Sequence, residues 1–138
     1  MFFDKFNYTI MNINLKDFII IGLIVLVLDF IAFKLFITAH FSKLIKQVQH
    51  SDMSVNYFGA GFAYLFITLT IYIFIIKGNL SLLHAGLLGF FVYGIYETTN
   101  FSILKDWTIL TILIDSIWGG ILFFTTTFLF RNFKKYIN

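Results

Sequence analysis

The chain has no cysteine and few charged side chains, and each shortage excludes a class of protein. Without cysteine there can be no disulfide, thiolate metal site or cysteine nucleophile. Only 12% of the 138 residues are charged, about half the share of a typical soluble domain, so a water-exposed surface would lack polar residues. The net charge of +3 is small and scattered, without the basic stripe of a nucleic-acid-binding protein, so no nucleic-acid partner is expected.

Apolar residues are abundant and fall into four long runs. They make up 59% of the chain, and the 20 phenylalanines exceed what one small core could bury, so we expect them to face lipid. Each run has about the 20 residues that cross a bilayer core. The runs are residues 18–41, 55–76, 81–99 and 107–130. We predict a single membrane domain over residues 1–138: an all-α integral membrane bundle of four transmembrane helices, up-down-up-down, in contact with the lipid bilayer.

The connections and small residues predict how these helices are joined. Gly78 and Asn79 tolerate positive φ, so residues 77–80 are expected to form a tight reversal between antiparallel neighbours. The polar connection 42–54 is expected to contain a short interfacial helix. Small residues at 59–63 and 86–94 predict two smooth seams for helix contact.

An even number of spans places both termini on the same side of the membrane. Six basic residues lie on that side: Lys5, Lys16, Lys77, Arg131, Lys134 and Lys135. Three lie on the other: Lys43, Lys46 and Lys105. The excess predicts cytoplasmic termini, although it does not say which membrane holds the protein.

Several polar side chains lie where lipid should reject them. Asp29 and Asp115 fall near the middle of the first and fourth spans, and Glu97 lies at the end of the third. An ionisable group inside a span costs about 2.5–3.5 kcal/mol, so it usually faces protein or a cavity. Lys34 can instead extend to the nearer interface. We predict a polar pocket that opens away from the termini and contains Asp29, Asn56, Tyr64, Tyr96, Glu97, Thr99, Asn100, Trp107, Asp115 and Trp118.

No pattern in the chain predicts a metal or a cofactor. His40 and His50 are ten residues apart, which is not a metal-ligand spacing, and the H-E-x-x-H motif is absent. No Ser-His-Asp order and no phosphate-binding glycine loop can be made out. We therefore expect no metal and no cofactor.

The second half of the chain is similar to the signature of a known family. The pattern is Gly89-x-x-x-Tyr93-Gly94-x-Tyr96-x-x-Thr99-Asn100-x-x-x-Leu104-x-x-Trp107, then Asp115-x-x-Trp118-Gly119. It resembles domain of unknown function 2177, a family of small predicted membrane proteins, mostly bacterial. Further recurrent positions of the family resemble Leu28-Asp29, Asn56 and Tyr64, so the similarity covers roughly residues 28–119.

The resemblance implies a fold and a set of linked residues, but no activity. It implies a four-span membrane protein in which the predicted pocket residues matter together. Two departures stand out. Glu97 replaces the family's usual aspartate, and no tryptophan follows Asp29.

Three classes of function remain open for the acidic pocket. A transporter or channel could use the acids to move protons, cations or a small polar solute, and with four spans it would need a homo-oligomer. A membrane-embedded enzyme on a lipid-like substrate could use Glu97 or Asp115 as general acid or base. In a structural protein, the acids would pair with Lys34 and lock the bundle, or the surface would bind another membrane protein.

Overall fold

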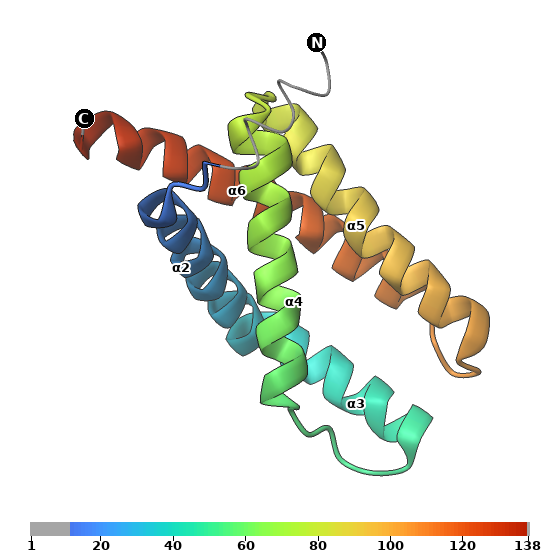
Figure 1. Cartoon of the computed structure of the whole chain (residues 1–138). Helices are drawn as coiled ribbons and strands as arrows, with labels where there is room; N and C mark the ends of the chain where they lie inside the picture. Colours follow the sequence, from blue (N-terminus) through green and yellow to red (C-terminus); the bar gives the residue numbers. More distant parts are fainter. Residues whose placement is uncertain (1–11, 138) are drawn as a thin grey trace.

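The computed structural model describes residues 12–137 and confirms the all-helical bundle (Figure 1). Helix α2 (Leu15–Ala32) continues through the π-helical segment η1 (Phe33–Ile37) into α3 (Thr38–Gln49). Helix α4 (Tyr57–Thr70) continues into a second π-helical segment, η2 (Ile71–Lys77). Helices α5 (Leu82–Ile103) and α6 (Ile109–Ile137) complete the chain. The described residues contain no strand.

Polar caps set the starts of three helices close to the predicted positions. The side chains of Asn14, Asn56 and Ser81 each accept the backbone N–H three residues further on, at 3.3, 3.1 and 3.3 Å. Such caps satisfy N–H groups that have no partner within the helix. At the other ends, α5 and α6 run to Ile103 and Ile137, beyond the predicted ends at residues 99 and 130.

Three helical stretches are long and apolar enough to cross a membrane. They are Leu15–Gln49, Tyr57–Lys77 and Ile109–Tyr136. The fourth helix of the bundle, α5, has 22 residues, about 33 Å at 1.5 Å per residue, which is enough to span a bilayer core. It is less apolar because its last turns carry Glu97, Thr98, Thr99 and Asn100.

Helix α3 is the helix predicted within residues 42–54, but it begins earlier and is continuous with α2. Leu44 is buried, whereas Lys43, Lys46 and Gln47 are exposed, so the helix has one apolar and one polar face. The stretch Leu15–Gln49 has 35 residues, about 50 Å of helix, which exceeds the roughly 30 Å of a bilayer core. The length and the two faces of α3 therefore agree with a position along the membrane surface.

The packed core is small, and most large apolar side chains lie outside it. The core cluster comes from α2, η2 and α6 and consists of Ile21, Val25, Ile71, Tyr72, Leu122, Phe123 and Phe130. Phe30, Phe58 and Phe66 are 64%, 77% and 63% exposed. An apolar surface of this extent would cause association in water, whereas in a bilayer it contacts acyl chains.

Helices α5 and α6 pack backbone against backbone along the predicted glycine seam. A Cβ at Gly86 would lie 3.6 Å from the carbonyl oxygen of Gly120. At Gly89 the helices are closer still, because a Cβ there would overlap the carbonyl oxygen of Gly119. At the other predicted seam, residues 59–63, no described residue lies within 4 Å of a Cβ at Gly61, and a Cβ at Gly59 would meet only the side chain of Asn56.

The predicted reversal at residues 77–80 joins η2 to α5, and its two turn residues act differently. Asn79 adopts the positive φ of 50°. Gly78 has an ordinary φ of −72°. It must be glycine because a Cβ would overlap the carbonyl oxygen of Phe74. The turn makes α4–η2 and α5 antiparallel, as predicted.

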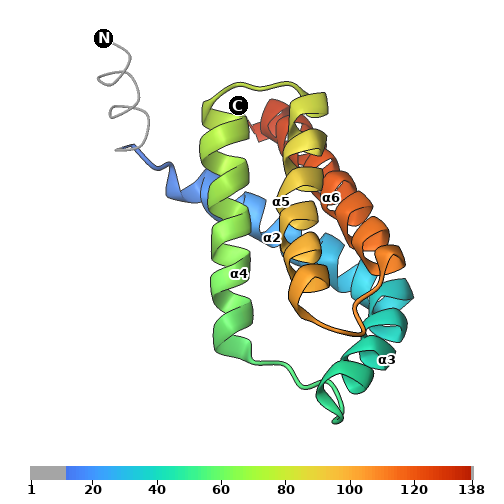
Figure 2. The same ribbon diagram turned by 90° about the vertical axis from the view of Figure 1, so that its right-hand side faces the viewer.

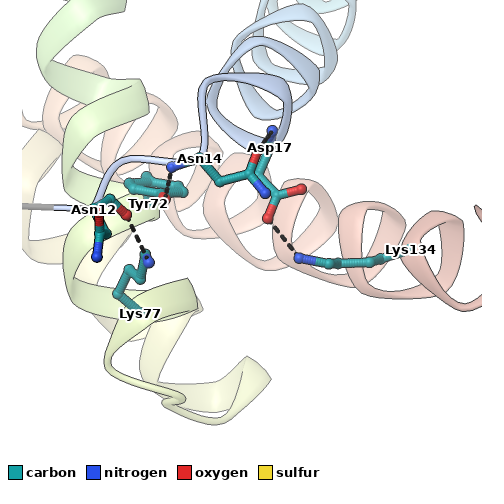
Figure 3. Close-up of polar contacts among 6 residues, drawn as sticks. All are labelled: Asn12, Asn14, Asp17, Tyr72, Lys77 and Lys134. Carbon is teal, nitrogen blue, oxygen red and sulfur yellow. Dashed lines mark hydrogen bonds and ion pairs between the residues drawn. The ribbon is translucent and has the colours of Figure 1, made fainter. Parts of the chain in front are cut away.

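One end of the bundle is held together by polar contacts (Figure 3). Since α2 begins and α6 ends there, the described ends of the chain lie on the same side of the bundle, as predicted (Figure 1). Figure 3 shows three of the contacts: Lys134 Nζ to Asp17 Oδ2 at 2.5 Å, Lys77 Nζ to the Asn12 carbonyl at 2.9 Å, and the Asn14 N–H to Tyr72 Oη at 2.8 Å. The fourth joins Arg131 Nη2 to the Leu80 carbonyl at 2.5 Å.

Helices α4 and α5 separate toward the opposite end of the bundle. They leave the reversal together and diverge along their length (Figure 1), and a view from the side shows α4 standing apart from α5 and α6 (Figure 2). Segment η2 packs on α5 near the reversal, whereas α4 packs mainly on α2. The space between α4 and α5 therefore lies away from the polar contacts of Figure 3.

Candidate functional site

A cavity of about 600 Å³ occupies the space between α4 and α5. Its walls come from the end of α2, from η1 and α3, from α4, from α5 and from α6. Seven of the ten predicted pocket residues line it: Asp29, Tyr64, Tyr96, Glu97, Trp107, Asp115 and Trp118. The fold thus brings together three acids that are far apart in the sequence.

Three predicted pocket residues do not line the cavity. Asn56 is the exposed cap of α4. Thr99 is exposed, and its hydroxyl donates to the carbonyl of Ile95 at 2.7 Å within α5. The Asn100 carbonyl accepts the Leu104 N–H at 2.8 Å where α5 ends. These contacts shape the ends of helices.

Asp29 is a buried residue of the cavity wall and joins three helices. It is 6% exposed. The Tyr64 hydroxyl of α4 donates to its Oδ2 at 2.6 Å, and the Trp118 indole N–H of α6 donates to its Oδ1 at 2.8 Å. Both donors are neutral, so the carboxyl is hydrogen-bonded on each oxygen without an ion pair.

Glu97 lies within a second polar cluster between α5 and α6. Its side chain is fully buried, and its Oε2 accepts the indole N–H of Trp107 at 2.7 Å. Asp115, on the neighbouring helix α6, lines the same cavity. The Oε1 of Glu97 has no donor among the described residues. A buried carboxyl oxygen without a donor is uncommon and requires an explanation.

Trp107 links this cluster to α3. It precedes α6 in the short connection from α5, where its N–H donates to the Leu104 carbonyl at 3.2 Å. It is 6% exposed, so its ring is turned inward. Its ring packs edge-on against the ring of Phe41, with 6.2 Å between the two ring centres. Close to it, His40 Nε2 lies 2.8 Å from Thr111 Oγ1 and joins α3 to α6.

Lys34 does not pair with the acids. It is exposed, and its Nζ lies 5.5 Å from the centre of the Phe30 ring. The ion pairs between described residues are Lys46–Asp52 and Lys134–Asp17, both outside the cavity. The hypothesis that Lys34 neutralises the buried acids is therefore wrong. Within residues 12–137, no group of three or more His, Asp or Glu side chains could hold a metal ion.

Sequence reasoning missed one entire wall of the cavity. Phe33, Ile37, Phe41 and Ile45 of η1 and α3 line it, and they carry no polar signal. Tyr93 also lines it. It lies four residues before Glu97, on the same helix face, and this spacing could have indicated that Tyr93 belongs to the pocket.

Comparison with known families identifies the group to which the chain belongs. Residues 14–130 match the sequence profile of a family described as "Predicted membrane protein (DUF2177)". The chain belongs to this family. The DUF2177 match extends from the cap of α2 into α6 and includes every cavity-lining residue. No curated protein and no solved structure shows significant similarity to the chain. Membership in DUF2177 therefore agrees with the membrane fold and supplies no activity.

The shape of the cavity limits what can reach its acids. Its exposed lining side chains include Ala63 of α4 and Val92 and Tyr96 of α5, so one opening lies between these two helices. Gln49 and Ser54 are also exposed and mark an opening where α3 ends. The first opening faces the lateral surface of the bundle, and the second faces its end.

Proposed function

We propose that the protein binds a lipid-like molecule in this cavity, with the polar group of the ligand next to Glu97 and Asp115. The observation that carries the proposal is the lateral opening between α4 and α5. A molecule dissolved in the bilayer can enter through it without leaving the membrane. The orientation favoured by the basic residues would place the other opening, at Gln49 and Ser54, on the side away from the cytoplasm.

The lining of the cavity supports an amphiphilic ligand. A volume of about 600 Å³ is within the range of small-molecule sites, which are mostly apolar with a few fixed polar groups. Ile37, Phe41 and Ile45 provide an apolar wall on η1 and α3, and the buried carboxyls of Asp29 and Glu97 provide the polar groups. An acyl-like chain would contact the apolar wall, and a polar group would reach the acids.

Filling the cavity should remove binding. Ala63 lines the cavity and Leu65 of the same helix does not, so Ala63→Phe should lower affinity for a long-chain amphiphile about tenfold or more, whereas Leu65→Phe should not change it. Both tryptophans of the chain, Trp107 and Trp118, line the cavity. Quenching of their fluorescence by a single-chain alcohol with a brominated tail, in nanodiscs, measures binding. Quenching that does not saturate, and is equal in both variants, would contradict the proposal.

The movement of protons or cations is a second candidate, and one observation favours it. Two carboxylates that line one cavity, as those of Glu97 and Asp115 do, repel each other unless a proton or a cation lies between them. Such a pair can take up and release a proton. Because the chain supplies a single four-helix bundle, this function would require a homo-oligomer to complete a path across the membrane.

Flux measurements test this second candidate. In vesicles that contain the purified protein and a pH-sensitive dye, Asp115→Asn should reduce proton flux at least tenfold. Asp106→Asn changes an exposed acid that does not line the cavity, and flux should not change. Equal flux in the two variants would rule out a role for the pair in permeation.

A further inference from the structure

The charges around the cavity are all of one sign. Three of its lining residues, Asp29, Glu97 and Asp115, carry carboxyl groups, and none of its lining residues within the described chain carries a basic side chain. An anionic head group would meet repulsion from every ionised carboxyl. A neutral head group would supply no counter-charge to the ionised form of the acids. The electrostatics therefore favour a cationic group.

The hydrogen bonds show which acid can still accept a hydrogen bond from a ligand. Asp29 has a neutral donor on each oxygen. Glu97 has one on Oε2, and its Oε1 is buried without a donor. An acceptor left unsatisfied in a water-poor site costs free energy, which a ligand N–H would recover. The position beside Glu97 and Asp115 is thus where a donor is missing.

Aromatic rings are part of the lining of the cavity that contains this position. Tyr93, Tyr96, Trp107 and Trp118 line the same cavity. Their faces attract cations, and the attraction is strongest for tryptophan and in desolvated sites. Carboxyls and aromatic rings together are the lining expected for an organic ammonium group. A bare metal ion would need several ligating side chains, and the described residues offer no such group.

We infer that the ligand is a long-chain amine whose primary ammonium donates to Glu97 Oε1 and to the carboxyl of Asp115. The inference rests on the proposed function and specifies the ligand class of the same site. The ammonium would supply the positive charge between the two carboxyls, and its N–H groups would satisfy the unpaired oxygen. A quaternary ammonium would be attracted by the rings but has no N–H to donate.

Four probes of different head group and length test the inference. They are dodecylammonium, dodecyltrimethylammonium, 1-dodecanol and butylammonium, added to the whole chain in nanodiscs of zwitterionic lipid, with tryptophan fluorescence and calorimetry as readouts. Dodecylammonium should bind saturably and about tenfold or more tightly than each of the other three, because only it combines an N–H donor, a positive charge and a long apolar chain.

Substitutions then assign the binding to the pair of acids. Glu97→Gln should weaken the binding of dodecylammonium about tenfold and that of 1-dodecanol much less, because only the ammonium carries a positive charge, and Asp115→Asn should do the same. Asp106→Asn is the matched control and should change neither. Since Gln retains an oxygen to accept from Trp107, the bundle should remain folded, which elution of a single monodisperse species on gel filtration would verify.

The outcomes separate this inference from the proposed function. Equal affinity for dodecanol or the trimethyl compound would overturn the primary-ammonium assignment and leave the binding of lipid-like molecules standing. Equal affinity for butylammonium would show that the protein does not recognise the alkyl chain of the ligand, and would overturn the assignment of a long-chain ligand. Absence of saturable binding by all four probes, with no effect of Ala63→Phe, would overturn both.

Discussion

Replacement of Gly89 by alanine should destabilise the bundle by about 3 kcal/mol, because α5 and α6 cannot stay in contact with a Cβ between them. The added atom would overlap the carbonyl oxygen of Gly119 and lie 2.7 Å from Cγ of Phe123. Backbone cannot rotate away as a side-chain tip can, so the two helices must separate. Helix association in lipid depends on such close packing, so the loss is not offset elsewhere.

Unfolding by a denaturing detergent in mixed micelles, followed by circular dichroism, measures this effect. Gly61→Ala is the matched control: it adds the same methyl group in a helix, and nothing lies within 4 Å of it. We expect this control to be neutral or to gain about 0.5–1 kcal/mol, since alanine is the better helix former. If Gly89→Ala unfolds at the same detergent fraction as Gly61→Ala, the close α5–α6 contact is wrong.

The same substitution should also disturb the cavity. Glu97 lies two turns after Gly89 on α5, and Asp115 lies on α6, so separation of the helices would separate the two carboxyls. Gly89→Ala is therefore expected to lower both the stability of the bundle and its affinity for the ligand. A substitution at the cavity wall alone should lower only the affinity.

Replacement of Asp29 by alanine should cost about 3 kcal/mol of stability, because it leaves two partly buried donors without an acceptor. The donors are the Tyr64 hydroxyl and the Trp118 indole N–H, at 2.6 and 2.8 Å. Asp29→Asn should cost only about 1 kcal/mol. Its oxygen can accept from Trp118, and its amide can donate to Tyr64, whose hydroxyl also accepts.

A double-mutant cycle on the same detergent-unfolding assay assigns the energy to this contact. The cost of Asp29→Ala should shrink in a Tyr64→Phe background, since one of the two donors is then absent. Asp52→Ala removes an acid whose ion pair with Lys46 is largely exposed, so it should cost almost nothing. An Asp29→Ala variant as stable as Asp52→Ala would show that Asp29 does not tie the three helices together.

Some of the predicted site residues line the cavity, and others lie at helix ends outside it. The pocket was predicted from polarity inside apolar runs. That signal works for Asp29 and Asp115, because a charge in mid-span has to turn inward. It is weaker near a helix end, where polar groups also form caps and turns. Asn56 and Asn100 belong to helix ends for this reason, whereas Glu97, only three residues before Asn100, is fully buried.

The sequence by itself determined the membrane class, the four helices, the reversal at residues 77–80 and the burial of Asp29, since these follow from local apolar runs and from the cost of a charge in lipid. Only the tertiary structure decided which helices touch. The glycines at 86–94 meet α6, whereas those at 59–61 meet no other helix within residues 12–137, although both stretches have small residues. The apolar wall of η1 and α3 and the presence of Glu97 and Asp115 in one cavity also depend on how distant segments pack. A smooth helix surface permits close contact but does not select its partner, because that choice is made by the shape of the whole bundle.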